Sequence, residues 1–195
     1  MLRPMPIILP MEKKQDSANR IASTAASHDF GLVRVDDRLL HGQIIAVWCK
    51  HQPFTQIVIV DDATAADPFF EEVLTLAAPP SIQVRVFSLD EGIRALGRED
   101  VPHKTTMILL KSPADAVRLY EGGIHYTALN IGGLSSRSRR RNVYKNIAIA
   151  EEELALLETL TEQGVAVTFL TVPGEKPRGL REILKQGPLT TRREP

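Results

Sequence analysis

The alternation of short apolar runs with helical patterns constrains the fold of this 195-residue chain more than any other feature. Residues 57–60 (IVIV) and 106–110 (TMILL) show no polar alternation, which is typical of strands buried on both faces of a parallel sheet. Similar β-rich runs occupy residues 32–35, 82–87, 128–131 and 165–172, and helical patterns separate most of them. The chain is therefore predicted to be α/β, with a single open, mainly parallel sheet and helices on both faces.

Helix-start signals support this order of elements. Ser88 and Glu91 have the spacing of a capping box, and Ser112 followed by Pro113 places a proline at the first helical position. Residues 42–52 and 66–77 also read as helices. Residues 151–163 form an amphipathic pattern with three acidic residues in the first turn.

The two ends of the chain lack this periodicity. We expect residues 1–30 to be a flexible N-terminal extension, residues 31–186 to form one domain, and residues 187–195 to be a C-terminal tail. Residues 135–141 (SSRSRRR) are the one strongly charged run and predict an exposed loop. Its arginines are either solvated or form a docking surface for an acidic or phosphorylated partner.

Composition excludes several classes of function. The 24 basic and 24 acidic residues balance, so no global positive field draws the chain to nucleic acid or anionic lipid. A single cysteine, Cys49, excludes an intramolecular disulfide framework and favours a cytoplasmic setting. It is most simply a core residue. No run approaches the ~20 apolar residues of a membrane span, and no histidine has metal-ligand spacing to other ligands.

The first strand leads into the densest group of reactive side chains. Asp36, Asp37, Arg38 and His41 follow residues 32–35, and ligands of open α/β sheets gather outside the carboxyl ends of strands. A neutral imidazole at His41 is a nucleophile near neutral pH, and Arg38 carries a planar fork that suits phosphate oxygens. Either Asp36 or Asp37 could fix the ring tautomer. These parts suit a phosphoryl group carried transiently on histidine.

The residues after His41 fit the same interpretation. Gly42 would let the backbone approach a ligand closely, and the helix that begins at Gly42 and Gln43 would direct N–H groups at an anion on His41. Gly42 and Gln43 are therefore candidate phosphate- or partner-binding residues. A capped or salt-bridged surface histidine is the structural alternative.

The segment VRVDDRLLHGQIIAVW resembles the signature of the IIB subunit of mannose-type (mannose, fructose, sorbose) bacterial sugar phosphotransferase systems. IVIVDDATAADP, KSPADAVRLYEGG and LNIGGL resemble later blocks of that family in the same order, over residues 31–183 in all. The N-terminal extension and the arginine-rich region from Leu134 to Tyr144 depart from the family pattern.

The resemblance implies a cytoplasmic phosphocarrier that associates peripherally with a membrane transporter. Such a protein accepts a phosphoryl group from phosphohistidine on a IIA subunit and passes it to a sugar bound by the membrane subunits IIC and IID. That makes it a protein-phosphohistidine–sugar phosphotransferase with no metal or organic cofactor. The phosphorylated histidine corresponds to His41, carrying the group on Nδ1, and Arg38 corresponds to the arginine that assists transfer to sugar.

Three further points concern the crevice, the function, and the sugar and oligomeric state. Arg34, the Asp61-Asp62 corner and the Gly132-Gly133 turn are weaker candidates for lining the same crevice. The alternative function is a regulatory module whose phosphohistidine reports the state of the system without carrying phosphate to sugar. Neither the sugar nor a homodimeric state follows from the sequence.

Overall fold

The protein is described by a computed structural model over residues 28–98, 101–137 and 139–185, so most of the predicted extension and the whole predicted tail lie outside the described residues. In chain order the elements are β1 (Leu32–Asp36), η1 (Ile44–Trp48), α1 (Cys49–His51), β2 (Gln56–Val60), α2 (Asp62–Ala65), α3 (Pro68–Ala77), β3 (Gln83–Phe87), α4 (Leu89–Leu96), η2 (His103–Thr105), β4 (Thr106–Leu110), α5 (Pro113–Glu121), β5 (Ala128–Gly133), β6 (Arg141–Tyr144), β7 (Ile147–Ile149), α6 (Glu151–Glu162), β8 (Ala166–Phe169), β9 (Arg178–Gly179) and α7 (Leu180–Leu184).

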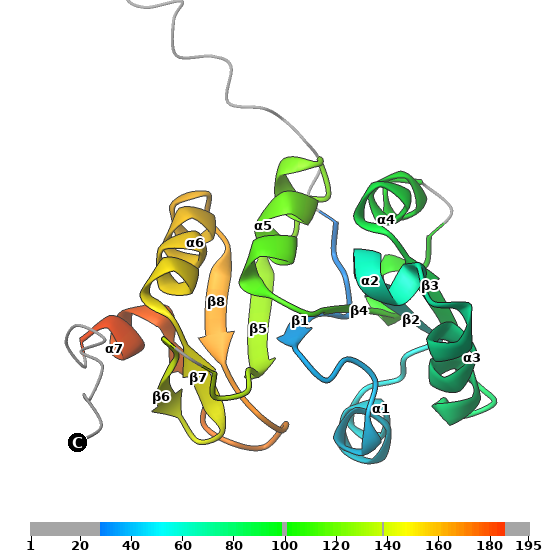
Figure 1. Cartoon of the computed structure of the whole chain (residues 1–195), viewed down its shortest axis with the longest axis horizontal. Coiled ribbons are helices and arrows are strands. Elements are labelled where there is room, and N and C mark those ends of the chain that lie inside the picture. Colours follow the sequence, from blue (N-terminus) through cyan, green and yellow to red (C-terminus); the bar gives the residue numbers. More distant parts are fainter. Residues whose placement is uncertain (1–27, 99–100, 138, 186–195) are drawn as a thin grey trace, which may run out of the picture.

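The main sheet has the strand order β3-β2-β4-β1-β5-β8-β9 (Figure 1). Its paired strands are parallel except β9, which runs antiparallel along the edge of β8. The predicted α/β class with a mainly parallel sheet is therefore confirmed. β1 lies at the centre between β4 and β5, so the residues that follow it emerge at the middle of the sheet's carboxyl edge.

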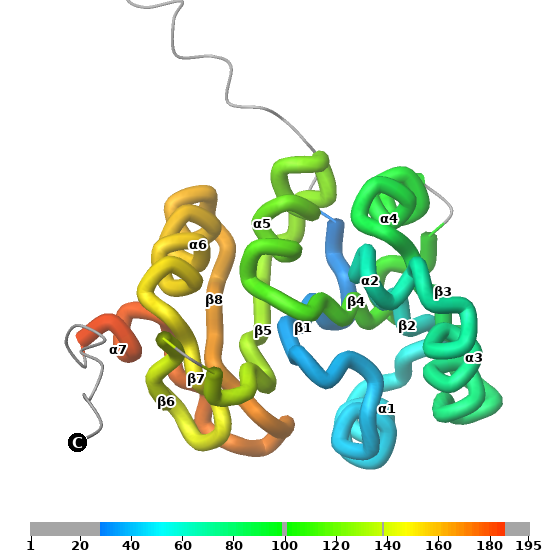
Figure 2. Tube along the Cα trace, viewed as in Figure 1, coloured from blue at the N-terminus to red at the C-terminus, as the bar shows by residue number. Residues whose placement is uncertain are grey.

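Helices cover both faces because the central strands are apolar on both sides. Val33 and Val35 of β1 point to one face and pack with α4, α5, α6 and α7. Ile57 and Ile59 of β2 point to the other face and pack with η1 and α3. Figure 2 shows α4, α5 and α6 on one side of the strands and α1 on the other.

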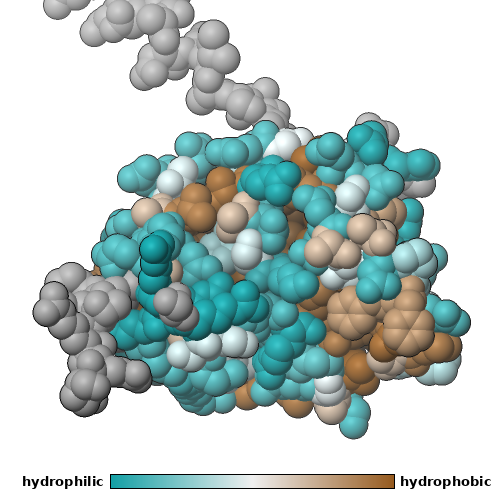
Figure 3. Space-filling view, viewed as in Figure 1, coloured by the Kyte–Doolittle hydropathy of each residue, from teal (hydrophilic) through white to brown (hydrophobic). Residues whose placement is uncertain are grey.

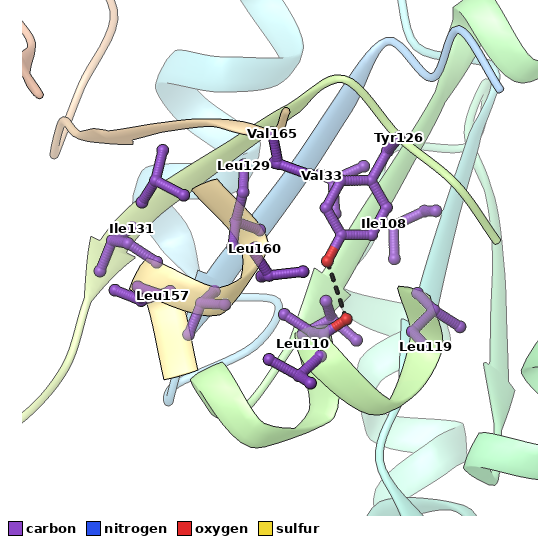
Figure 4. Close-up of a cluster of buried hydrophobic side chains, with 14 of the residues drawn as sticks. Val33, Ile108, Leu110, Leu119, Tyr126, Leu129, Ile131, Leu157, Leu160 and Val165 are labelled. Carbon is purple, nitrogen blue, oxygen red and sulfur yellow. Dashed lines mark hydrogen bonds between the residues drawn. The ribbon is translucent and has the colours of Figure 1, made fainter. Parts of the chain in front are cut away.

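The first of these cores includes one satisfied polar group. Figure 4 shows Tyr126 among the aliphatic side chains of the β1–α5–α6 region, and its hydroxyl donates to the carbonyl oxygen of Ala116 at 2.8 Å. A buried hydroxyl needs such a partner, because leaving it unpaired would cost roughly 1–3 kcal/mol. Burial raises the pKa of Tyr126, so this hydroxyl remains a donor.

The local helix signals act as predicted. The Glu91 carboxylate accepts from the Ser88 backbone N–H at 3.1 Å, and the Ser112 hydroxyl accepts from the Asp115 N–H at 3.2 Å. The helix predicted at 42–52 forms, but its central part is the π-helix η1. This conformation is rare and often accompanies functional sites.

The region after β5 differs from the prediction of a simple exposed loop. Ser135, Arg137 and Arg139 are exposed, whereas Arg140 has a side chain only 10% exposed and Arg141 begins β6. β6 and β7 form a separate antiparallel hairpin. Apolar residues of this hairpin, Val143 and Ile147 among them, pack into the core and hold the segment down.

The residues just before the predicted amino-terminal boundary make tertiary contacts. His28, which the sequence assigns to the extension, donates its backbone N–H to the His125 carbonyl at 2.6 Å. Its ring stacks on Phe30 and meets the edge of His103. Tertiary aromatic contacts therefore bring residues 28–30 into the domain, although their sequence carries no strand pattern.

Candidate functional site

The carboxylate of Asp36, the last residue of β1, is the hub of the candidate site. It is fully buried and accepts from Arg34 Nη2 at 2.9 Å. It also accepts from Arg38 Nε and Nη2 at 3.0 and 3.1 Å, and lies 3.2 Å from His41 Nε2. One carboxylate thus fixes two guanidiniums and an imidazole, each through a charge-assisted or directional bond.

A tight turn makes this convergence possible. The Leu39 N–H donates to the Asp36 carbonyl at 2.9 Å, and Leu39 has φ of +55°, in the left-handed region that non-glycine residues rarely adopt. Leu39 is buried against the core on the η1 side of the sheet, which holds this unfavourable backbone conformation. The turn reverses the chain so that Arg38 and His41 fold back over the strand end.

Arg34 anchors the hub from beneath. Its buried guanidinium donates to Asn130 Oδ1 at 2.5 Å and to the carbonyls of Leu170 and Thr171 at 3.0 and 3.2 Å. It also lies 4.9 Å from the centre of the Trp48 ring. These partners come from β5, the segment after β8 and η1, so Arg34 ties together the elements that surround the site.

Two glycines at the end of β5 make room for the hub. A Cβ on Gly132 would lie 1.7 Å from Arg34 Cζ, and one on Gly133 would lie 2.6 Å from Asp36 Oδ1. A register shift between β1 and β5 opposite Val35 and Asp36 brings Gly133 beside the carboxylate. The Gly132-Gly133 turn, a weak sequence candidate, therefore contacts the site directly.

The electrostatics of the hub favour an ionised Asp36. Burial by itself would raise the pKa of Asp36, but hydrogen bonds from His41 and Arg38 and the charge of Arg34 outweigh it and hold the pKa far below its usual range. Burial is also the main reason that the pKa of Arg34 is lowered, and the charge of Asp36 opposes this. A buried carboxylate with these partners stays negative at physiological pH.

The His41 ring has a defined orientation. The Gln43 backbone N–H donates to His41 Nδ1 at 3.3 Å, so Nδ1 must offer a lone pair. In the neutral ring the proton then resides on Nε2 and points at Asp36. The side chain of His41 is 17% exposed and that of Arg38 is 42% exposed, so both reach the surface.

The remaining sequence candidates near His41 are Gln43 and Gly42. Gln43 also accepts from Arg38 Nη2 through its side-chain oxygen, at 3.4 Å. A Cβ on Gly42 would meet no protein atom within 4 Å, so packing in the protein does not require glycine there. The role of Gly42 as a phosphate- or partner-binding residue therefore stays a prediction.

Of the two candidate aspartates, Asp36 contacts His41. Asp37 turns away and accepts from the Ser135 N–H and hydroxyl at 2.8 and 3.1 Å. The Asp61-Asp62 corner makes its contacts elsewhere: Asp61 caps α2 through Thr64, and Asp62 accepts from the Leu89 N–H. The corner therefore has no observed contact with the hub.

Sequence reasoning missed Asn130, and it included Ser135 and Arg140 only as members of the charged run at 135–141, without their contacts to Asp37. The one available signal was the amide of Asn130 inside an otherwise apolar strand, since a buried polar group there needs a partner. Cys49, assigned to the core, is half-buried against the η1-side core, and this burial raises its pKa. Within residues 28–98, 101–137 and 139–185, no group of three or more His, Cys, Asp or Glu side chains is placed to hold a metal ion.

Comparison with known proteins identifies the family. Residues 30–193 match the family model described as the PTS system sorbose subfamily IIB component. The chain belongs to this family. It is a IIB component of the sugar phosphotransferase system, which agrees with the resemblance carried by its sequence blocks.

Individual relatives agree. This IIB chain is 33% identical over 157 residues to the mannose-specific EIIAB component of Escherichia coli K12, covering 80% of this chain and 49% of that protein. It thus spans about half of that relative. It is 29% identical over 154 residues to the fructose-specific EIIB component of Bacillus subtilis, covering 79% and 94%. The crystal structure of the sorbose permease IIB domain from Klebsiella pneumoniae superposes with a TM-score of 0.75 at 26% identity, covering 81% and 97%.

None of the helices in the described part of this IIB chain is long and apolar enough to cross a membrane.

Proposed function

We propose that this IIB chain carries a phosphoryl group on His41 Nδ1, received from phosphohistidine on a IIA protein and delivered to a sugar held by membrane subunits IIC and IID. The observation that carries the proposal is the orientation of the His41 ring. Nε2 faces a buried carboxylate, and Nδ1 presents its lone pair beside the backbone N–H of Gln43.

The first transfer follows from this geometry. The Nδ1 lone pair is released from its hydrogen bond with the Gln43 N–H and forms a new P–N bond as the donor's P–N bond breaks. The departing donor imidazole keeps the electron pair of the broken bond. The proton on Nε2 stays in place, so the phosphorylated ring carries a positive charge. The negative charge of Asp36, 3.2 Å away, stabilises that cation without moving during the reaction.

Arg38 and Gln43 supply the complementary positive potential. The Gln43 N–H lies next to the atom that receives the phosphoryl group, and the Arg38 guanidinium is half-exposed while held by Asp36. A guanidinium fixed in this way can bind phosphoryl oxygens without a large reorganisation. We therefore assign Arg38 to the transfer from His41 to the sugar hydroxyl, and the chain to the phosphotransferases with an alcohol acceptor.

Exposure of the site suits a carrier that meets two macromolecular partners in turn. His41 lies between the turn that follows β1 and the helix that contains η1, and its side chain is 17% exposed. Each partner could therefore reach it at the protein surface. We propose that the chain works in the cytoplasm, bound peripherally to its transporter. A purely regulatory phosphohistidine module is the competing proposal, and it would not require Arg38 to be positioned beside His41.

The test is phosphotransfer from phosphoenolpyruvate through the general phosphotransferase proteins and a IIA domain, followed by intact-mass analysis. The wild-type protein should gain one acid-labile phosphoryl group and His41→Ala none. His51→Ala, which removes an exposed histidine at the end of α1, is the matched control and should be phosphorylated normally. Stoichiometric phosphorylation of His41→Ala would show that the acceptor is another residue.

A further inference from the structure

The arginine-rich segment after β5 is built directly onto the candidate site. Ser135 donates to the Asp37 carboxylate through its N–H and its hydroxyl. Arg140 Nη1 lies 3.6 Å from Asp37, and the same guanidinium donates to the Ser135 carbonyl at 3.1 Å. The segment is therefore fixed to the residue that follows Asp36, the partner of His41.

Arg140 also anchors the segment to the opposite side. Its guanidinium makes a two-pronged contact with Glu153 in the first turn of α6, through Nε at 2.9 Å and Nη2 at 2.5 Å. Paired, fork-to-fork contacts of this kind fix geometry as well as charge. Because its side chain is only 10% exposed, Arg140 supports the loop and is not available to a partner.

Two other arginines of the segment remain at the surface. The side chain of Arg137 is 65% exposed, and its contact with Asp37, at 3.8 Å, is a rim contact. Arg139 is exposed and has φ of +73°, within a turn closed by a bond from the Arg140 N–H to the Arg137 carbonyl at 3.0 Å. Asp37 already accepts from Ser135, so Arg137 adds charge where the carboxylate is largely satisfied.

The surface around this segment is strongly hydrophilic. In Figure 3, teal surface covers the region where Figure 1 places β6 and β7, and a brown patch covers the region of α3. The α3 patch is made by exposed apolar side chains, among them Phe69 and Leu76. The polar and apolar regions lie on the same view of the molecule, and the polar one includes the segment that contacts Asp37.

We propose that Arg137 and Arg139 form a docking surface for the phosphohistidine-bearing donor protein, whose phosphoryl group is negatively charged, and set its rate of association. This inference rests on the proposed function of His41. It goes beyond that function by assigning partner recognition to two residues that lie outside the group from Asp36 to Gln43.

The order of the two encounters decides between the partners. When the donor approaches, about two negative charges of the phosphoryl group are on the partner, and they are attracted to the two cations at the rim. Arg137 and Arg139 therefore steer this encounter. When the membrane subunits are met, the phosphoryl group is on this chain and offsets the positive charge that Arg137 and Arg139 contribute. The steering charge is then already neutralised, so it favours the first partner.

The test compares two double variants with the same change in net charge. Arg137→Gln/Arg139→Gln removes the proposed surface, and Arg85→Gln/Arg94→Gln removes two exposed arginines of β3 and α4. The second-order rate constant of phosphoryl transfer is measured by rapid quench, with a phosphorylated IIA domain that phosphorylates the wild-type chain. Measurements are made at low and high ionic strength.

We expect the Arg137/Arg139 variant to react about tenfold more slowly at low salt, and the difference to disappear as salt screens the charges. The Arg85/Arg94 variant should stay within about twofold of wild type. Arg137→Glu/Arg139→Glu should be slower still, with unchanged thermal unfolding showing that the variants are folded.

Each contrary result has a distinct meaning. Equal losses in both double variants, or a loss that does not depend on salt, would overturn the docking surface. Normal donor kinetics with impaired phosphorylation of sugar would reassign the surface to the membrane subunits. If no IIA domain phosphorylates the wild-type chain, the proposed function itself fails. If the wild-type chain is phosphorylated and the Arg137/Arg139 variant reacts at the same rate, only the docking surface is refuted.

Discussion

Replacing Asp36 by asparagine tests the central physical claim about the site, because it removes the charge with little change in shape. In the wild-type protein one carboxylate oxygen accepts from the Arg38 N–H and Nε, and the other accepts from Arg34, from Arg38 Nη2 and from His41. An asparagine keeps one acceptor and turns the other oxygen into a donor. Whichever way the amide is oriented, an N–H group must then face another donor.

The expected loss of stability follows from this mismatch. Arg34 is fully buried, and removing the charged partner of a buried ion pair costs about 3–5 kcal/mol. The free energy of unfolding of a domain is about 5–15 kcal/mol in total. The Asp36→Asn protein should therefore be folded but markedly less stable. The remaining bonds from Arg34 to Asn130 and to two backbone carbonyls keep the loss at the lower end of that range.

The expected loss of activity has a different origin. If the asparagine amide donates to His41 Nε2, the ring proton moves to Nδ1, and the lone pair that should attack phosphorus disappears. A wrong imidazole tautomer of this kind lowers the rate by about 10⁴ in a serine protease triad, and we expect a loss of about 10³–10⁴ here. Asp37→Asn is the matched control for the tautomer, since the contacts of Asp37 are with Ser135, Arg137 and Arg140 and not with His41.

Two measurements separate the effects. Urea unfolding gives the free energy of unfolding, and ¹⁵N NMR of the imidazole reads the His41 tautomer in the folded state. Because the folded-state pKa of Asp36 is lowered, its stabilisation is complete above the ordinary aspartate pKa of about 3.9 and is lost as pH falls below it. The stability difference between wild type and Asp36→Asn should therefore be largest near neutral pH and shrink in acid. A difference below about 1 kcal/mol at neutral pH, or an unchanged tautomer with normal phosphorylation, would refute the reasoning.

Three further substitutions test other parts of the site. Arg38→Lys replaces a fork by a point charge, so phospho-His41 should still form while transfer to sugar in membranes containing IIC and IID falls about a hundredfold; equal loss of both steps would contradict the assigned role. Gly42→Ala should leave stability unchanged or raise it by up to about 1 kcal/mol, because the added Cβ meets no protein atom, yet it should slow phosphorylation measured by intact mass; a normal rate would show that no ligand approaches this backbone closely. Gly132→Ala should lower the free energy of unfolding in urea by more than about 3 kcal/mol, because the added Cβ would overlap Arg34 Cζ. Gly179→Ala is the control and should be neutral, because the space around its Cβ is open. Equal stabilities of the two variants would show that β5 can shift to accept a side chain.

Much of the site could be located from the sequence, because its members are close together along the chain. Asp36, Arg38 and His41 lie within six positions after a strand, and the structure brings all three into contact. Asp37, equally close in sequence, could not be told apart from Asp36. The difference depends on the left-handed turn at Leu39 and on Ser135, which lies 98 positions away.

The sequence by itself determined the layers of the fold and the place of the reactive group. Apolar runs such as residues 57–60 can be buried only between two helical layers, and caps such as Ser88 act within one turn of their own helix, so both signals are local. Tertiary structure alone decided that the buried Arg34 guanidinium binds Asn130 and the carbonyls of Leu170 and Thr171, and that Arg140 bridges to Glu153. These features depend on buried polar partners from distant segments, which must be satisfied once the chain is folded but leave no periodic trace in the order of residues.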